Sequence, residues 1–164
     1  MIFVTVGSQK FQFNRLLKAI DTLVKNNSIT EEVFAQTGYS DYKPKYYKYR
    51  EFLNRDEFAN LEDQADIVIT HGGTGAIVGA VKKGKKVVAV PRLKKYDEHV
   101  DDHQIQIITE FKKQNLIYSV VECNKLEDAL KFVKSHNFNI YMSNTKKIED
   151  SIEKFIEKEI IWKF

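Results

Sequence analysis

Short runs of apolar residues alternate with segments of helical periodicity along most of this chain. Ile2–Val6, Ile67–Thr70 and Val87–Val90 are apolar or β-branched at nearly every position, not at every second one. A strand of that kind is buried on both faces, which is typical of a parallel sheet covered by helices. We therefore predict an α/β fold: a single, doubly wound, Rossmann-like domain with a mainly parallel sheet.

The expected elements follow from these patterns and from the glycines, prolines and capping residues between them. Strands are expected at Ile2–Val6, Val33–Gln36, Tyr46–Tyr49, Ile67–Thr70, Val87–Val90 and Ile117–Val121. Helices are expected after Asn14 and over Asp56–Gln64, Ala76–Lys83, Asp101–Lys113, Lys125–Ser135 and Thr145–Ile160. Asn14, and Asn124 with Glu127, are predicted to cap the helices that follow them.

Composition limits the class of protein. The 164 residues fit one domain, and 26 basic against 23 acidic residues leave a net charge of only +3, too small an excess to indicate nucleic acid. Cys123 is the only cysteine, which excludes a disulfide framework and favours a reducing cytoplasm. No apolar run approaches the ~18 residues of a membrane span, so membrane contact is expected to be peripheral or through a partner.

The segment Thr70-His-Gly-Gly-Thr-Gly75 carries the clearest functional signal. Its glycines let a ligand approach the backbone, and the helix predicted to follow has unpaired N–H groups that favour a phosphate. The plainer alternative is a tight turn whose glycines serve helix–strand packing. Gly7-Ser8-Gln9, after the first strand, is a second and weaker candidate for the same role.

Absent motifs narrow the ligand. The first strand is not followed by G-x-G-x-x-G, and no G-x-x-x-x-G-K-[ST] occurs, so neither a dinucleotide fingerprint nor a P-loop is present. His71-Gly72-Gly73 is similar to an esterase oxyanion loop, but no G-x-S-x-G elbow supplies a nucleophile. These exclusions leave a phosphate-bearing ligand that is held mainly by backbone groups.

The strand–His71-Gly72-Gly73-x-Gly75–helix unit, followed by Pro91 and Asp102-His103-Gln104, resembles the C-terminal domain of glycosyltransferase family 28. The resemblance is closer to stand-alone versions of that domain. These include the UDP-GlcNAc-binding subunit of the dolichol-pathway enzyme and small capsular or exopolysaccharide transferase subunits. The resemblance implies one half of a GT-B glycosyltransferase, with residues 1–164 as a single nucleotide-sugar-binding domain.

The resemblance also implies roles for individual residues. Substrate binding is expected of Gly7, Ser8, Phe52, Leu53, His71, Gly72, Gly73, Thr74, Gly75, Asp102, His103 and Gln104. Phe52 and Leu53 would hold the uracil, the glycine loops would face the diphosphate, and Asp102 to Gln104 would reach the sugar. The general base is expected on the other half of the enzyme; His71 and His103 are the candidates in this chain. Gly79 stands where family members carry a glutamate for the ribose.

The function implied is transfer of a sugar from a UDP-sugar to a lipid-linked acceptor in surface polysaccharide assembly. Activity is expected only with a membrane-associated partner that binds the acceptor, at the inner face of the membrane. We expect no cofactor, no metal and no nucleic acid. A regulatory nucleotide-binding module, and a hydrolase or epimerase of nucleotide-sugars, are the alternatives.

Three other segments have competing interpretations. Asp97 to His103 contains two histidines four residues apart, which suits a metal, but a solvated acidic turn is the preferred reading. Tyr42 to Arg50 interleaves aromatic and basic residues, and a solvent-facing strand is preferred over nucleic acid or membrane contact. The helix over about 145–160 has one apolar face that is expected to join the core, and this helix with the apolar tip Ile160–Phe164 is also the candidate docking element for a partner.

Overall fold

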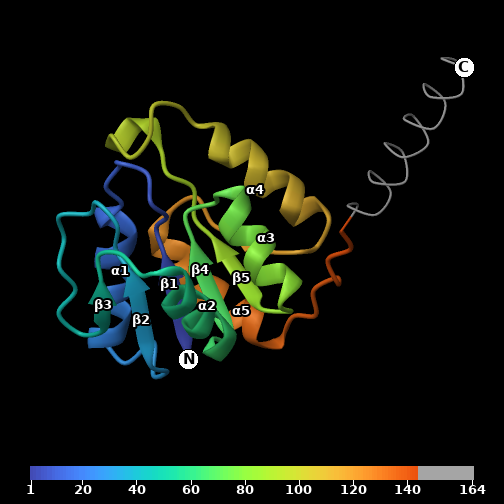
Figure 1. The fold of residues 1–164 in the computed structure, drawn as a ribbon, viewed down its shortest axis with the longest axis horizontal. Helices are drawn as coiled ribbons and strands as arrows, with labels where there is room; N and C mark the ends of the chain where they lie inside the picture. Colours follow the sequence, from blue (N-terminus) through green and yellow to red (C-terminus); the bar gives the residue numbers. More distant parts are fainter. Residues whose placement is uncertain (144–164) are drawn as a thin grey trace, which may run out of the picture.

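A computed structural model describes residues 1–143, in which six parallel strands form one sheet (Figure 1). The strands are β1 (Ile2–Thr5), β2 (Val33–Gln36), β3 (Lys48–Arg50), β4 (Ile67–Thr70), β5 (Lys86–Ala89) and β6 (Tyr118–Ser119). The α-helices are α1 (Asn14–Lys25), α2 (Arg55–Gln64), α3 (Thr74–Lys82), α4 (His103–Lys113) and α5 (Leu126–Ser135). Two short 3-10 helices, η1 (Lys94–Tyr96) and η2 (Cys123–Lys125), complete the element order. The predicted doubly wound, parallel α/β fold is confirmed.

Each face of the sheet has its own core because successive strand residues point to opposite sides. Val4 of β1 packs with Leu16 of α1 and Leu130 of α5 on one face. Phe3, its neighbour in the chain, packs on the other face with residues of α2, α3 and α4. Its ring meets that of Phe58 edge to face, with centroids 5.1 Å apart. Burial on both faces explains why these strands are apolar without alternation.

The strand order β3-β2-β1-β4-β5-β6 places a topological switch between β1 and β4. From β1 the chain continues to β2 on one side, and from β4 it continues to β5 on the other. Thr5 of β1 and Thr70 of β4 are paired in register, so the loops after the two strands begin at the same level of the sheet. Ligands of doubly wound folds bind at this point.

The predicted starts or caps of three helices, α1, α3 and α5, are wrong. Helix α3 begins at Thr74, two residues before the predicted start, so Thr74 and Gly75 belong to its first turn. Asn14 is the first residue of α1 and not its cap, and its Oδ1 accepts from the Tyr42 amide. Asn124 and Glu127 do not form the predicted capping pair, because η2 intervenes before α5.

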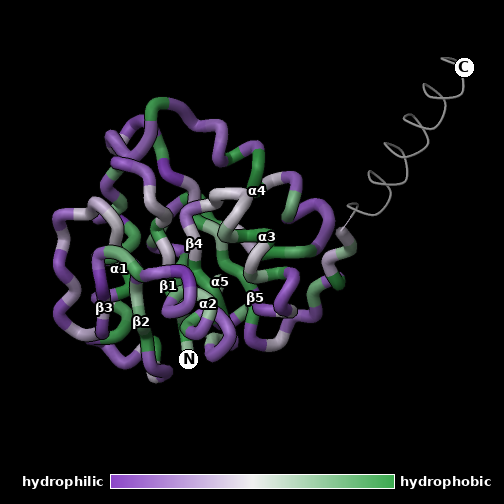
Figure 2. The backbone as a smooth tube through the Cα atoms, in the orientation of Figure 1, coloured by the Kyte–Doolittle hydropathy of each residue, from purple (hydrophilic) through white to green (hydrophobic). Residues whose placement is uncertain are grey.

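The predicted helix over about 145–160 and the tip Ile160–Phe164 lie outside the described residues. Within residues 1–143, no helix is both long enough and apolar enough to cross a bilayer. Figure 2 shows hydrophobic positions concentrated in the sheet and hydrophilic positions in many of the outer loops.

Candidate functional site

A cleft of about 420 Å³ lies at the carboxyl edge of the sheet, between the loops that follow β1 and β4. Its walls come from both loops, from the end of β2 and from the first turns of α2 and α3. The lining residues are Thr5, Gly7, Ser8, Gln9, Gln36, Phe58, His71, Gly73, Gly75 and Ala76. The structure therefore brings together five of the predicted site residues: Gly7, Ser8, His71, Gly73 and Gly75.

The imidazole of His71 explains two of the glycines. Gly7 has a φ of +77°, and a Cβ there would lie 2.6 Å from His71 Cε1. A Cβ on Gly73 would lie 2.5 Å from His71 Nε2. The ring thus fills the space that two side chains would need, so packing alone requires glycine at both positions.

The other two glycines of the second loop differ from each other. Gly72 has a φ of +84°, and a Cβ there would lie 2.8 Å from Ile108 of α4, so it also serves packing. Gly75 has no heavy atom within 4 Å of the position of a Cβ. It is exposed and lies on the wall of the cleft. Of these glycines, Gly75 is the one whose missing side chain leaves open space for a ligand.

The N-terminus of α3 has the properties of an anion site. Its N-cap residue is Gly73, which has no side chain to accept from the first N–H groups. Helix α2 is different, because Asn54 and Glu57 form a reciprocal capping box. Unpaired N–H groups and the positive end of the helix dipole favour a phosphate. At α3 this end meets the cleft through Gly73, Gly75 and Ala76.

Burial keeps His71 neutral. Its side chain is almost inaccessible, and loss of solvation, with a smaller effect of the Arg92 charge, lowers its pKa from 6.5 to about 4. A hydrogen bond to the Thr5 carbonyl opposes that shift without reversing it. An imidazole with this pKa is a weak base near neutral pH. The neutral ring can still donate or accept a hydrogen bond to or from a ligand in the cleft.

The first loop is held by a buried arginine that sequence analysis did not identify. Arg92, in the segment after β5, is fully buried, and its Nη2 donates to the carbonyl oxygens of Val6 at 2.6 Å and Phe11 at 3.1 Å. Its Nε and Nη1 have no hydrogen-bond partner among the described residues. Burial lowers the pKa of Arg92 to about 10, so it remains cationic at neutral pH.

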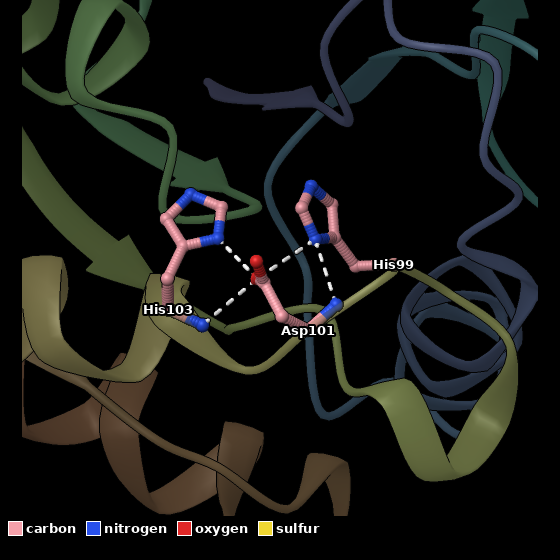
Figure 3. A group of neighbouring side chains, drawn as sticks. All are labelled: His99, Asp101 and His103. Carbon is pink, nitrogen blue, oxygen red and sulfur yellow. Dashed lines mark hydrogen bonds and ion pairs between the residues drawn. The ribbon is translucent and has the colours of Figure 1, made fainter.

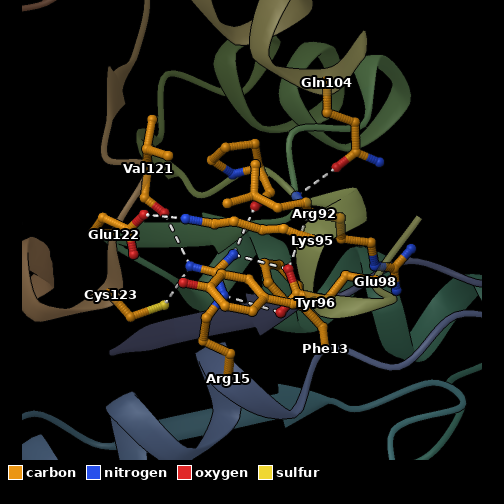
Figure 4. Close-up of polar contacts among 12 residues, drawn as sticks. Phe13, Arg15, Arg92, Lys95, Tyr96, Glu98, Gln104, Val121, Glu122 and Cys123 are labelled. Atoms are coloured by element: carbon orange, nitrogen blue, oxygen red, sulfur yellow. Dashed lines mark hydrogen bonds and ion pairs between the residues drawn. The ribbon is translucent and has the colours of Figure 1, made fainter. Parts of the chain in front are cut away.

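A second arginine joins α1 to the segments that follow β5 and β6 at the same edge (Figure 4). Arg15 of α1 donates to both carboxylate oxygens of Glu98, to the carbonyls of Pro91 and Val121, and to Cys123 Sγ at 3.3 Å. Glu98 is fully buried and also accepts from the Leu93 amide. The segment from Pro91 to His99 is therefore packed into the protein at both of its ends, while Lys94 to Asp97 between them are exposed.

The predicted trio Asp102, His103 and Gln104 lies at the start of α4, outside the cleft lining. Asp102 Oδ1 accepts from the Lys94 amide at 2.8 Å. Gln104 is buried, and its Oε1 accepts from the Arg92 amide at 2.9 Å. His103 is exposed and pairs with Asp101. Their roles in sugar recognition stay predictions, and Asp102 and Gln104 also hold the loop before α4.

Phe52 and Leu53 lie beside the cleft. The Leu53 amide donates to Gln36 Oε1 at 3.3 Å, and Gln36 lines the cleft. Phe52 is exposed and meets the ring of Tyr39 at 5.1 Å. Gln36 was not identified from sequence, although a polar residue at the end of a buried strand is a recognisable signal.

The missing side chain at Gly79 has a local explanation. A Cβ there would lie 3.3 Å from Glu62 Oε1 of α2, a buried carboxylate that pairs with Lys83 at 2.8 Å. The space where family members are expected to carry a glutamate therefore borders another carboxylate.

A hollow of about 480 Å³ lies at the opposite, amino edge of the sheet, next to Met1, Asp66 and several lysines. Its lysines already have partners: Lys83 pairs with Glu62 and Asp63, and Lys134 with Glu31. The cleft at the switch point, with its uncapped helix, is the better candidate for ligand binding.

The fold and this cleft define a Rossmann-like domain of the type that forms one half of a GT-B glycosyltransferase. The model of the glycosyltransferase family 28 C-terminal domain matches residues 1–159. The chain belongs to this family.

Similar proteins agree with the assignment. The UDP-N-acetylglucosamine transferase subunit ALG13 of Kluyveromyces lactis is 37% identical over 60 residues, which cover 37% of this chain and 28% of that protein. An NMR structure of ALG13 matches with a TM-score of 0.57 at 16% identity. The match covers 87% of this chain and 89% of the ALG13 chain. A crystal structure of the glycotransferase of kitacinnamycin matches with a TM-score of 0.57 at 18% identity. That match covers 83% of this chain and 35% of the glycotransferase chain. The matched stretches span about a third or less of the curated relatives' length.

The two kinds of glycine in the cleft should respond oppositely to alanine. Gly7→Ala should lower the free energy of unfolding by about 2 kcal/mol or more, because it combines a left-handed φ with a collision against His71. Gly75→Ala should leave it unchanged or raise it by about 0.5–1 kcal/mol, because it removes a helical glycine next to open space. Urea denaturation of both variants provides the measurement. Equal effects would contradict the packing role assigned to Gly7.

His71 should make stability depend on pH. Its pKa is lowered by folding, so the unfolded chain takes up a proton that the folded chain refuses. The stabilisation is complete above pH 6.5 and is lost as the pH falls toward 4, by on the order of 3 kcal/mol in total. Denaturation midpoints between pH 7 and 4 measure it. In His71→Asn that part of the slope should disappear; an unchanged slope would show that other groups cause it.

Proposed function

We propose that this chain is the donor-binding subunit of a glycosyltransferase that moves a sugar from a UDP-sugar to a lipid-linked acceptor in surface polysaccharide assembly. The observation that carries the proposal is the uncapped N-terminus of α3, which opens into the switch-point cleft of a family 28 domain. The curated relatives are named as subunits of a UDP-N-acetylglucosamine transferase, which supports both the donor class and the need for a second subunit.

In this reaction the acceptor hydroxyl attacks the anomeric carbon, the bond to the diphosphate breaks, and its electron pair leaves with UDP. Negative charge grows on the diphosphate, and groups that already point at that position stabilise it without reorganisation. The N–H groups at the start of α3 would supply this stabilisation next to Gly75, with Gly7 and Ser8 on the opposite wall. The uracil would lie toward Gln36 and Leu53, at the end of β2.

A second subunit completes the site in this proposal. The described domain would bind the donor in its own cleft, whereas sugar transfer also needs a positioned acceptor and exclusion of water. A general base is also needed, and the low pKa of His71 makes it a poor one. A membrane-associated partner would provide the base, the acceptor and attachment to the inner face of the membrane. The tip Ile160–Phe164 stays the predicted docking element.

Gly75 allows a test of the phosphate site that does not disturb the fold. Gly75→Asp should weaken UDP binding by about tenfold or more, because a carboxylate would face the diphosphate; its charge suits the helix dipole, so stability should hold. Gly75→Asn has nearly the same shape without the charge and should bind better than Gly75→Asp. Titration calorimetry with UDP and ADP gives the affinities. Equal binding by both variants would place the phosphate elsewhere, and equal affinity for UDP and ADP would remove the uridine assignment.

The chain alone should transfer no sugar. Transfer from UDP-GlcNAc or another UDP-sugar to a lipid-linked acceptor should appear when the membrane-associated partner is co-expressed, and radiolabelled product in the membrane fraction measures it. Deleting 160–164 should then reduce pairing with the partner. Robust transfer by the isolated chain would refute the two-subunit model. UDP binding without transfer in any pairing would favour a regulatory module.

A further inference from the structure

Three side chains with metal-binding atoms meet at the carboxyl edge, beside the start of α4 (Figure 3). His99, Asp101 and His103 each offer one ligand atom, and these atoms all lie within 4.8 Å of one another. Figure 3 shows both imidazoles turned toward the Asp101 carboxylate that lies between them. The sequence alone favours a solvated acidic turn over a metal here, and the convergence of the three side chains reverses that preference.

The contacts within the cluster call for positive charge at its centre. Asp101 Oδ1 lies 3.2 Å from His99 Nδ1 and also contacts His103 Nδ1. The Asp101 amide lies 3.4 Å from the same nitrogen, and it can donate there only when Nδ1 is unprotonated and offers its lone pair. A nitrogen lone pair that also faces a carboxylate oxygen is repelled by it unless a proton or a cation lies between them.

The protein holds the cluster from both flanks. Glu98, one residue before His99, is buried and bound to Arg15. Gln104, one residue after His103, is buried and bound to the Arg92 amide. The His99 ring itself lies between the rings of Phe11 and His103, at 4.9 Å from each. Ligands held in this way lose little conformational entropy when an ion binds.

The donor set selects the kind of ion. Two imidazole nitrogens and one carboxylate oxygen suit divalent transition metals, whereas Mg²⁺ and Ca²⁺ prefer oxygen ligands alone. His99 is buried, while Asp101 and His103 are exposed. A bound ion would therefore keep open coordination positions on the solvent side, which water or a phosphate oxygen can fill.

We propose that His99, Asp101 and His103 form a binding site for a divalent transition-metal ion such as Zn²⁺. The ion would bind through the two Nδ1 atoms and a carboxylate oxygen, and it would take the His99 lone pair in place of the long contact from the Asp101 amide. The proposal goes beyond the proposed function and does not depend on it, because in that function the N-terminus of α3 would supply the charge stabilisation without a metal.

The test uses the full chain without a histidine tag. Zn²⁺ and Mg²⁺ are titrated by calorimetry, and Co²⁺ is followed by its visible absorption, which reports nitrogen ligation. Asp101→Asn and His103→Gln change exposed ligands, so both should fold. His136→Gln is the matched control, because His136 lies beside Phe132 and Phe138 at the end of α5, away from the cluster.

We expect one Zn²⁺ or Co²⁺ per chain and no comparable binding of Mg²⁺. Each ligand variant should weaken binding by about tenfold or more, while His136→Gln binds as the parent does. Two outcomes would overturn the proposal: no saturable binding of Zn²⁺ or Co²⁺ by the parent, or equal binding by the ligand variants and the parent.

Discussion

The carboxyl edge of this domain depends on one buried cation. The Arg92 guanidinium donates to the carbonyls of Val6 and Phe11, and so holds the loop that follows β1 at two points. The amide of the same residue is bound by Gln104, which ties that loop to the start of α4. A buried charge is costly unless it is bonded, and in the described residues it is Nη2 whose hydrogen bonds hold the Arg92 guanidinium. Its position is therefore coupled to the position of two loops that come from opposite sides of the switch point.

His71 reconciles the two interpretations of the glycine-rich loop. Packing around its ring requires glycine at positions 7 and 73, as the plainer interpretation holds. The same packing leaves Gly73 as a cap without a side chain, so the N–H groups of α3 stay available to the cleft. The packing of the glycines around His71 therefore also leaves the start of α3 free to bind a ligand, so the two interpretations are compatible.

The sequence predicted the strands and helices, because these depend on residues that are close together in the chain. Runs such as Ile67–Thr70 fixed the strands, and helical spacing of apolar residues fixed most helices to within two residues. The supporting network was missed because its partners are distant in the chain: Arg15 and Glu98 are 83 residues apart, and Arg92 and Val6 are 86 apart. An isolated charge in a polar stretch looks solvated until the fold supplies its partner. The family resemblance assigned His71 and the glycines to one site, but it did not identify Gln36 or Phe58.

The single cysteine has a consequence for chemical modification. Cys123 is partly buried beside Arg15, and burial raises the pKa of its thiol to about 11. Because only the thiolate reacts readily with alkylating agents and oxidants, this thiol should be nearly inert at neutral pH. The chain should therefore tolerate oxidative conditions without dimerising through sulfur. A cysteine introduced on its surface would accept a fluorophore or spin label selectively, with the native thiol left in place.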